Sequence, residues 1–409
     1  MPAFLSRPLP VAILLAFAAQ ALFSYGLGTP AILVFDEIHY VPAARAILAL
    51  SHPVNTEHPL LGKTLIAAGM ALFGDNPVGW RALSTVAGTA TVLGVYAILL
   101  RLFASVRTAA FGALFALFNF TIFVHARIAM LDGFMAAFVV LAVAAMLQAT
   151  RSRPRLWWTV SSTLLGLAVG VKWAAAPYVA YAGAAFLLLK WRRPDLWPGL
   201  SIVGGLAILG VVSIATYFLT FAPAFFYAAR PLTLATLIPF QLEMYQLQTQ
   251  VLSPHTYQSQ WWSWPLLLRP IWYLYEPVDG AQRGILLVGN PAVMWGGLIA
   301  VAACAWAFLR DRDWKLGGAA ALWIGSYGVW AIIPKSLGFF YYYYLPSIFL
   351  SIALAAAAHR YMRGKLESWD ESFLALAAGL FLYFYPILSA DALPNPGAFR
   401  RWTWFETWV

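Results

Sequence analysis

Residues 8–40 read PLPVAILLAFAAQALFSYGLGTPAILVFDEIHY, an apolar run that ends in two adjacent carboxylates and a histidine. A run of this length can form a helix that crosses the ~30 Å hydrocarbon core of a bilayer. It follows a short basic start ending at Arg7 and has no convincing small-residue cleavage site, so we expect a retained signal anchor. Asp36, Glu37 and His39 would then lie where the helix leaves the bilayer. A dense acidic group at that place is a candidate site.

The composition of the whole chain indicates a membrane protein. Of its 409 residues, 62% are hydrophobic and only 10% are charged, and the mean hydropathy is +0.74. A soluble domain carries roughly 25% charged residues, so an all-α polytopic integral membrane protein is predicted. The net charge of +10 falls into loop clusters, and we expect no nucleic-acid partner. The single cysteine, Cys304, excludes an internal disulfide and a cysteine-based metal cluster.

The spacing of the apolar runs predicts the topology. Eleven runs approach spanning length, near residues 8–30, 80–101, 109–125, 128–148, 157–171, 173–190, 197–219, 284–309, 316–333, 339–358 and 371–388. Basic clusters follow every second run, at Arg101/Arg107, Arg151/Arg153/Arg155, Lys190/Arg192/Arg193, Arg310/Arg312/Lys315 and Arg360/Arg363/Lys365. By the positive-inside rule the N-terminus is predicted to be cytoplasmic and the C-terminus outside. We therefore expect one transmembrane domain over 1–409, with long outer loops at 36–79 and 220–283 and no inserted accessory domain.

The first outer loop carries the residues best suited to acid–base chemistry. After Asp36 and Glu37 come His52-Pro53 and then Glu57-His58-Pro59-Leu60-Leu61-Gly62-Lys63. A glycosyl transfer needs a carboxylate to accept the proton of the attacking hydroxyl, and two carboxylates can divide the roles of base and orienting group. The alternative is that both acids are hydrated at head-group level or pair with Arg45 or Lys63. A zinc site is a further alternative, although the histidines and acids do not have the spacing of a zinc signature.

Isolated charges at other predicted outer edges suggest an anion site. They are Arg127 and Asp132 around the hairpin between the third and fourth runs, Lys172 between the fifth and sixth, and Lys335 in Pro334-Lys335-Ser336. An unpaired charge at a membrane edge is costly, so such residues favour an ion pair or a substrate path. Cations from several runs are what a lipid-linked phosphate would require. The alternatives are snorkelling to lipid phosphates and a structural pair of Arg127 with Asp132.

The second outer loop combines aromatic and polar side chains, in His255-Thr256-Tyr257 and in Gln258-Ser259-Gln260-Trp261-Trp262-Ser263-Trp264. Sugar faces stack on aromatic rings, and sugar hydroxyls need donors and acceptors of the Gln and Ser type. The alternative is the ordinary aromatic girdle of a membrane interface.

Together these segments resemble the protein O-mannosyltransferase family, membrane enzymes of the GT-C class that use a polyprenyl-phosphate sugar donor. The matching segments, in order, are Asp36 to Tyr40, His58 to Lys63, Arg81 after Gly79-Trp80, Arg127 to Asp132, Gly170 to Trp173, and His255 through Pro265 followed by Gly289-Asn290-Pro291. The resemblance implies an eleven-helix GT-C fold, with Asp36 as general base beside Glu37 and with inversion at the sugar carbon. It also implies a compact bacterial form in the inner membrane, without a catalytic metal or cofactor, with its active site facing the periplasm. Pairing with a second chain stays open.

The expected function is transfer of a sugar, with mannose favoured, to a Ser or Thr hydroxyl of an exported protein. A lipid or polysaccharide acceptor is the alternative, and a transporter or flippase is a rival of another class. The candidate donor-binding residues are Arg127, Asp132, Lys172, Lys335, His58, Lys63 and Arg81. The candidate acceptor or loop residues are His39, His255, Gln260, Trp261 and Trp264.

Overall fold

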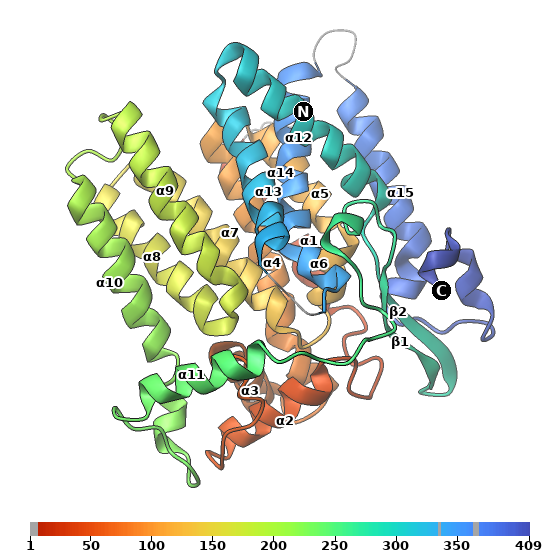
Figure 1. The fold of residues 1–409 in the computed structure, drawn as a ribbon. Coiled ribbons are helices and arrows are strands. Elements are labelled where there is room, and N and C mark those ends of the chain that lie inside the picture. The colour runs from red at the N-terminus through yellow and green to blue at the C-terminus, as the bar shows by residue number, and fades with distance from the viewer. Residues whose placement is uncertain (1–6, 334–336, 363–367) are drawn as a thin grey trace. The chain divides into compact units, whose positions relative to one another are not determined.

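The computed structural model describes residues 7–333, 337–362 and 368–409, and most of them are helical (Figure 1). The chain divides into two compact units built from alternating segments. The first unit comprises Met1–Phe35, Val95–Ile128 and Val251–Val409, and the second comprises Asp36–Gly94 and Ala129–Gln250. The acidic pair and the first outer loop belong to the second unit.

The second unit is a helical bundle with a short helical pair in its first loop. Its helices are α2 (Glu37–Leu48), α3 (Leu61–Phe73), α4 (Pro77–Phe103) as far as Gly94, α7 (Leu131–Ala149), α8 (Pro154–Val171), α9 (Ala176–Arg192), α10 (Ile202–Leu219) and α11 (Leu237–Gln248). Helix α8 packs mainly between α7 and α10. A Cβ at Gly166 would lie 2.5 Å from the carbonyl oxygen of Ser213, so only glycine permits this approach. Ser213 Oγ also donates to the carbonyl of Ser162 at 2.9 Å, as small and polar residues do between membrane helices.

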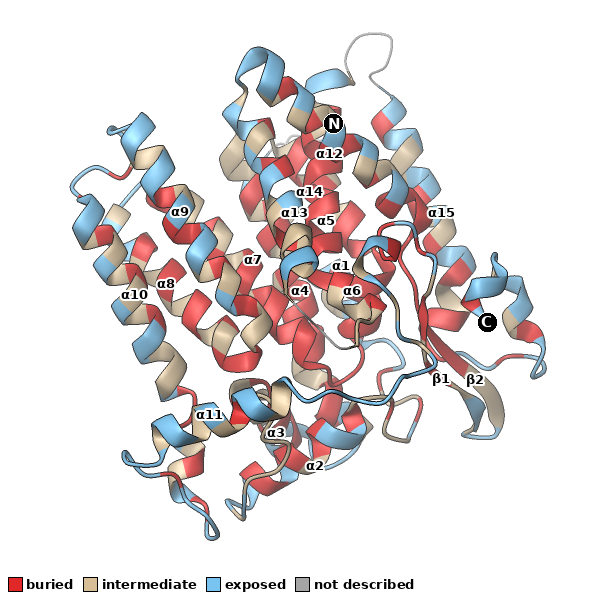
Figure 2. Cartoon of the chain, in the orientation of Figure 1, coloured by how far each residue is buried: buried red, intermediate tan, exposed pale blue. Residues whose placement is uncertain are grey.

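The first unit is organised around one buried helix. Its elements are α1 (Pro8–Ser24), the remainder of α4, α5 (Val106–Leu117), α6 (Phe120–His125), β1 (Ile271–Val278), β2 (Ala281–Leu287), α12 (Pro291–Asp311), α13 (Trp314–Ile332), α14 (Tyr344–Tyr361) and α15 (Trp369–Leu388). Helix α14 packs against α5, α12 and α13 and is buried along almost its whole length, as Figure 2 shows. This unit also has short 3₁₀ helices at Trp261–Ser263, Phe340–Tyr343, Ala398–Arg401 and Glu406–Trp408, and the second unit has two, at Trp173–Ala175 and Ala222–Phe226.

Helices long and apolar enough to cross a membrane number seven in the part of the chain that the structure describes. They are Pro77–Phe103, Leu131–Ala149, Trp173–Arg192, Ile202–Phe226, Pro291–Asp311, Phe340–Tyr361 and Trp369–Leu388, and Pro8–Ser24, Leu61–Phe73 and Val106–Leu117 are shorter apolar helices. The integral-membrane class is therefore confirmed. The count of eleven spans and the orientation of the termini stay predictions.

Two predicted runs are each divided into two elements in the structure. The run 109–125 is broken into α5 and α6, because the Asn119 side chain accepts a hydrogen bond from Thr121 N and so starts a new helix. The run 284–309 begins as strand β2, and α12 starts only at Pro291, after the capping residue Asn290.

The β1–β2 hairpin was not predicted. Its strands are antiparallel, and Val278 pairs with Ala281 across a two-residue turn. The turn residues Asp279 and Gly280 have φ angles of 51° and 72°, as a type I′ hairpin turn requires.

Candidate active site

Glu37 is immobilised in the second unit. Arg81 on α4 donates from Nε to Oε1 and from Nη2 to Oε2 of Glu37, each at 2.8 Å. The backbone N–H of Ala129 donates to the same Oε1 at 2.8 Å. Both side chains of the ion pair have an exposed fraction of 0%. The oxygens of Glu37 therefore already accept charge-assisted hydrogen bonds from two separate segments.

Asp36 differs from its neighbour in almost every respect. It is only partly buried, and no ion pair among the described residues includes it. The hydroxyl of Tyr40, one helical turn along α2, donates to its Oδ2 at 3.3 Å. Burial raises the pKa of the Asp36 carboxyl above its ordinary value, Asp132 adds to this effect, and Lys172, His39 and Tyr40 oppose it. The two acids thus differ, since Glu37 is paired with Arg81 and burial raises the pKa of Asp36.

Lys172 and Asp132 form a buried ion pair whose charges act on Asp36. Lys172 Nζ lies 3.0 Å and 2.9 Å from the two carboxylate oxygens of Asp132. Lys172 follows the last residue of α8, and Asp132 lies in the first turn of α7, where the helix dipole favours a negative charge. The structure therefore brings together three of the predicted residues, Asp36, Asp132 and Lys172.

Lys63 supports the loop of residues 55–58. Its ammonium donates to the carbonyl of Asn55 at 2.5 Å and to that of His58 at 2.8 Å, and Asn55 Nδ2 donates to Glu57 at 2.8 Å. Burial lowers the pKa of Lys63 to about 7, and the charge of Glu57 opposes this shift. Lys63 thus shapes the loop that presents His58, and the roles of both residues toward a donor stay predictions.

Arg127, in the first unit, completes the end of α1. It donates to the carbonyls of Phe23 at 3.1 Å and Gly26 at 3.2 Å, and also to that of Tyr25. These contacts satisfy carbonyls that a helix C-terminus leaves without partners. Asp132 pairs with Lys172 within the second unit, and the alternative of a pair with Arg127, which would join the two units, stays a prediction. Lys335 lies outside the described residues.

The predicted residues of the second outer loop lie in the first unit and have different surroundings. A pocket of about 510 Å³ is lined by Gln258, Ser259, Gln260, Trp262, Ser263, Leu268, Arg269, Gly338 and Thr407. Gln260 thus lines a cavity, whereas Trp264 is buried and donates from its indole to Ser259 Oγ at 2.9 Å. Trp261 packs against Tyr327, and exposed His255 contacts the ring of Phe339. His39, in the second unit, is exposed on α2.

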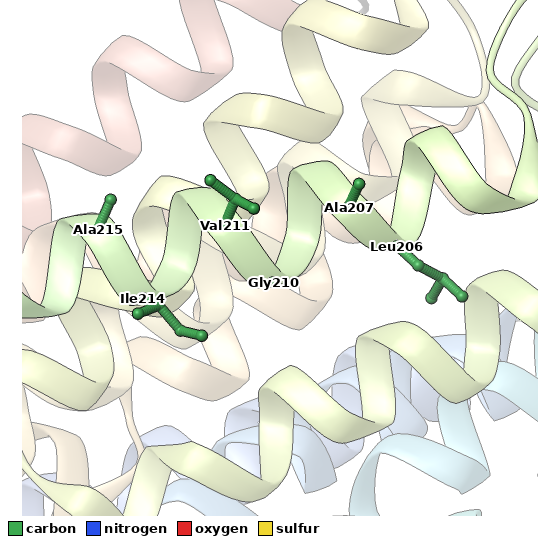
Figure 3. Close-up of a pocket in the computed structure, with 6 residues that line it drawn as sticks. All are labelled: Leu206, Ala207, Gly210, Val211, Ile214 and Ala215. Atoms are coloured by element: carbon green, nitrogen blue, oxygen red, sulfur yellow. The ribbon is translucent and has the colours of Figure 1, made fainter.

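A second groove, shown in Figure 3, lies on the surface of α10. It is lined by Leu206, Ala207, Gly210, Val211, Ile214 and Ala215, all without polar side chains. This surface suits lipid and offers no group for chemistry. Across the described residues, no three His, Cys, Asp or Glu side chains are grouped so that they could hold a metal ion.

Two residues of the candidate site were not predicted from the sequence, Tyr40 and Gln248. The contact of Tyr40 with Asp36 could have been predicted from the sequence. Tyr40 follows Asp36 by four positions, and residues four apart on a helix are neighbours. Gln248, at the end of α11, donates from Nε2 to the carbonyl of Glu57 at 2.5 Å and lies 2.9 Å from Nδ1 of His58. No local pattern could have linked residues 190 positions apart.

Two family models match consecutive parts of the chain. The model described as dolichyl-phosphate-mannose-protein mannosyltransferase matches residues 57–218. The model described as the C-terminal four TMM region of protein-O-mannosyltransferase matches residues 233–408. The chain is also 29% identical to a polyprenol-phosphate-mannose–protein mannosyltransferase of Mycolicibacterium smegmatis (strain MKD8), over 93% of this chain and 88% of that protein.

Two solved structures are similar in fold. The S. cerevisiae protein O-mannosyltransferase Pmt1-Pmt2 complex bound to the sugar donor has a TM-score of 0.84 at 14% identity, covering 98% of this chain and 92% of that chain. ArnT from Cupriavidus metallidurans bound to undecaprenyl phosphate has a TM-score of 0.58 at 18% identity, covering 92% and 64%. At these identities the likeness concerns the fold alone, and it confirms the predicted fold class.

Proposed function

Because this chain belongs to the protein O-mannosyltransferase family, we propose that it transfers mannose from a polyprenyl phosphate to a Ser or Thr hydroxyl of an exported protein. The multi-pass architecture suits a lipid-linked donor, whose polyprenyl chain needs hydrocarbon around it. We place the protein in a bacterial inner membrane, with the first outer loop on the periplasmic side, as the distribution of basic loops favours.

One observation carries the proposal. Of the three acids Asp36, Glu37 and Asp132, only Asp36 lacks an ion-pair partner among the described residues. A general base must be free to accept a proton in the transition state. The raised pKa of Asp36 also makes it a better base than an ordinary aspartate.

The reaction is a single displacement. Asp36 accepts the proton of the acceptor hydroxyl while the hydroxyl oxygen forms a bond to the anomeric carbon of the sugar. The bond from that carbon to the phosphate oxygen breaks, and the polyprenyl phosphate leaves with the electron pair. Attack opposite to the leaving group inverts the configuration. Glu37, held by Arg81, keeps the start of α2 in place so that Asp36 meets the hydroxyl.

The departing phosphate needs positive charge rather than a proton. Lys172 is the candidate that the contacts favour, because its ammonium acts electrostatically on Asp36 and so lies near the proposed base. Arg81 and Lys63 serve the donor site indirectly, through Glu37 and the 55–58 loop. We expect transfer to continue in the presence of a chelator.

The test uses the purified full-length protein and a polyprenyl-phosphate-mannose donor with two acceptors in parallel, a Ser/Thr peptide and a lipid-linked glycan. Mannosylation of the peptide supports the proposal, and mannosylation of the glycan alone would replace the acceptor class. Transfer to neither acceptor, with lipid moving across proteoliposomes instead, would overturn the enzymatic function.

A further inference from the structure

The last residue of α11 contacts the loop that carries His58. Gln248 lies one helical turn after Met244, which is completely buried and anchors this face of the helix. Its side-chain nitrogen Nε2 is 2.5 Å from the carbonyl oxygen of Glu57 and 2.9 Å from Nδ1 of His58. Two consecutive residues of the loop are therefore held by one amide group.

These two contacts determine the protonation of the imidazole. A carbonyl oxygen can only accept, so the nitrogen of Gln248, not its oxygen, must face Glu57. The amide nitrogen carries two hydrogens and accepts no hydrogen bond, so Nδ1 of His58 must act as the acceptor. An imidazole that accepts at Nδ1 is neutral and carries its proton on Nε2.

We propose that Gln248 is a positioning residue that holds His58 in the neutral Nε2–H form, and that His58 donates from Nε2 to an oxygen of the lipid-linked sugar. The second part rests on the proposed function. The His58 ring meets the ring of Tyr40 edge-on at 6.1 Å, and Tyr40 donates to Asp36, so the imidazole belongs to the surroundings of the base.

A neutral donor suits this position for a chemical reason. A protonated Nε2 cannot take the proton of the acceptor hydroxyl, so His58 in this form does not compete with Asp36. It also adds no positive charge beside the carboxylate, and the basicity of Asp36 is kept.

The informative variant is Gln248→Glu. It has the same length but replaces the donating nitrogen by an oxygen that accepts, which favours a proton on Nδ1 of His58. The matched control is Gln246→Glu, which makes the same change of charge on the exposed side of the same helix. Both variants are compared with the wild-type protein in the same detergent.

The tautomer is measured directly by nitrogen NMR of protein labelled with ¹⁵N-histidine. The chain has six histidines, and the signals that disappear in His58→Gln belong to His58. We expect an unprotonated Nδ1 and a protonated Nε2 in the wild type and in Gln246→Glu, and a protonated Nδ1 in Gln248→Glu. A protonated Nδ1 in the wild type would overturn the assignment, whether or not the protein transfers mannose.

The consequence for the donor is measured by a double-mutant cycle. Gln248→Glu should raise the KM for the donor by about tenfold, the worth of one good hydrogen bond. In His58→Gln, the amide NH₂ of the new glutamine donates in place of Nε2–H. An amide has no alternative tautomer, so adding Gln248→Glu to this variant should change the KM much less than it does in the wild type. An equal loss in both backgrounds would show that Gln248 only holds the loop, and would overturn the proposal.

Discussion

Arg81 and Glu37 form a two-pronged ion pair in which neither side chain has any exposed surface. A buried pair of this kind costs desolvation free energy that its own attraction only partly offsets. In this protein the pair fixes a position, because it joins Glu37, the first residue of α2, to Arg81 on α4. The preceding residue, Asp36, is thereby held in place at the start of α2.

Asp36→Asn should reduce mannosyl transfer by about 10²–10⁴-fold, because the amide cannot accept the hydroxyl proton. The variant should insert into membranes and elute as a single species, since Asp36 makes no ion pair among the described residues. Asp75→Asn is the matched control, because Asp75 pairs with Arg45 at an exposed position where an ion pair contributes little. Turnover of purified Asp36→Asn at the wild-type rate would show that another group is the base.

Glu37→Gln should lower the free energy of unfolding by about 3–5 kcal/mol, because it leaves the buried guanidinium of Arg81 without its counter-charge. The measurement is thermal unfolding of the purified protein in detergent. Replacing both partners by leucine should cost less than Glu37→Gln, as removal of a complete buried pair usually does. If Glu37→Gln unfolds at the wild-type temperature, the pair does not hold α2.

The acid limb of the kcat–pH profile should lie above the ordinary aspartate pKa of 3.8, because burial, the largest effect, raises the pKa of Asp36. The enzyme is active when Asp36 is deprotonated, so activity falls as the pH drops through this raised pKa. Tyr40→Phe and Lys172→Met should each move the limb to higher pH, since both groups favour the charged form. Asp132→Asn should move it to lower pH, and shifts of the same sign in all three variants would contradict this electrostatic account.

Lys63 should make stability depend on pH between about 7 and 10.5. Its pKa is lower in the folded protein than in the unfolded chain, so the unfolded state binds more protons in this range and stability rises with pH. The difference in unfolding free energy between the wild type and Lys63→Met should grow by a few kcal/mol from pH 7 to pH 10. A difference that does not vary with pH would mean that Lys63 keeps its proton in the folded state.

Sequence patterns predicted the architecture well where the signal was local. Each of the eleven apolar runs contains helix in the structure. A long run of apolar residues is visible in the sequence itself and requires no knowledge of distant partners. The break at Asn119 and the strand over Ala281–Leu287 were missed, since capping by one side chain and cross-strand pairing depend on partners elsewhere. The hairpin turn at Asp279-Gly280 did carry a local signal.

The candidate site shows the same limit. Asp36, Glu37, Asp132 and Lys172 could be named because charge beside apolar sequence is rare. Which of them pair could not be predicted, because the partners are 44 and 40 positions apart. The sequence suggested Arg81 as a donor-binding residue but gave no sign of its ion pair with Glu37, and its role toward the donor stays a prediction.

With Glu37 neutralised by Arg81 and Asp132 by Lys172, these five side chains retain one uncompensated negative charge, on Asp36. The proposed transfer turns a phosphodiester with one negative charge into a phosphomonoester that can carry two. The proton accepted by Asp36 offsets that added negative charge, so the chemical step leaves the net charge of the site and its bound lipid unchanged. The polyprenyl phosphate and the proton on Asp36 must then both leave before another turnover. Because their charges interact, release of the lipid phosphate and deprotonation of Asp36 are thermodynamically linked.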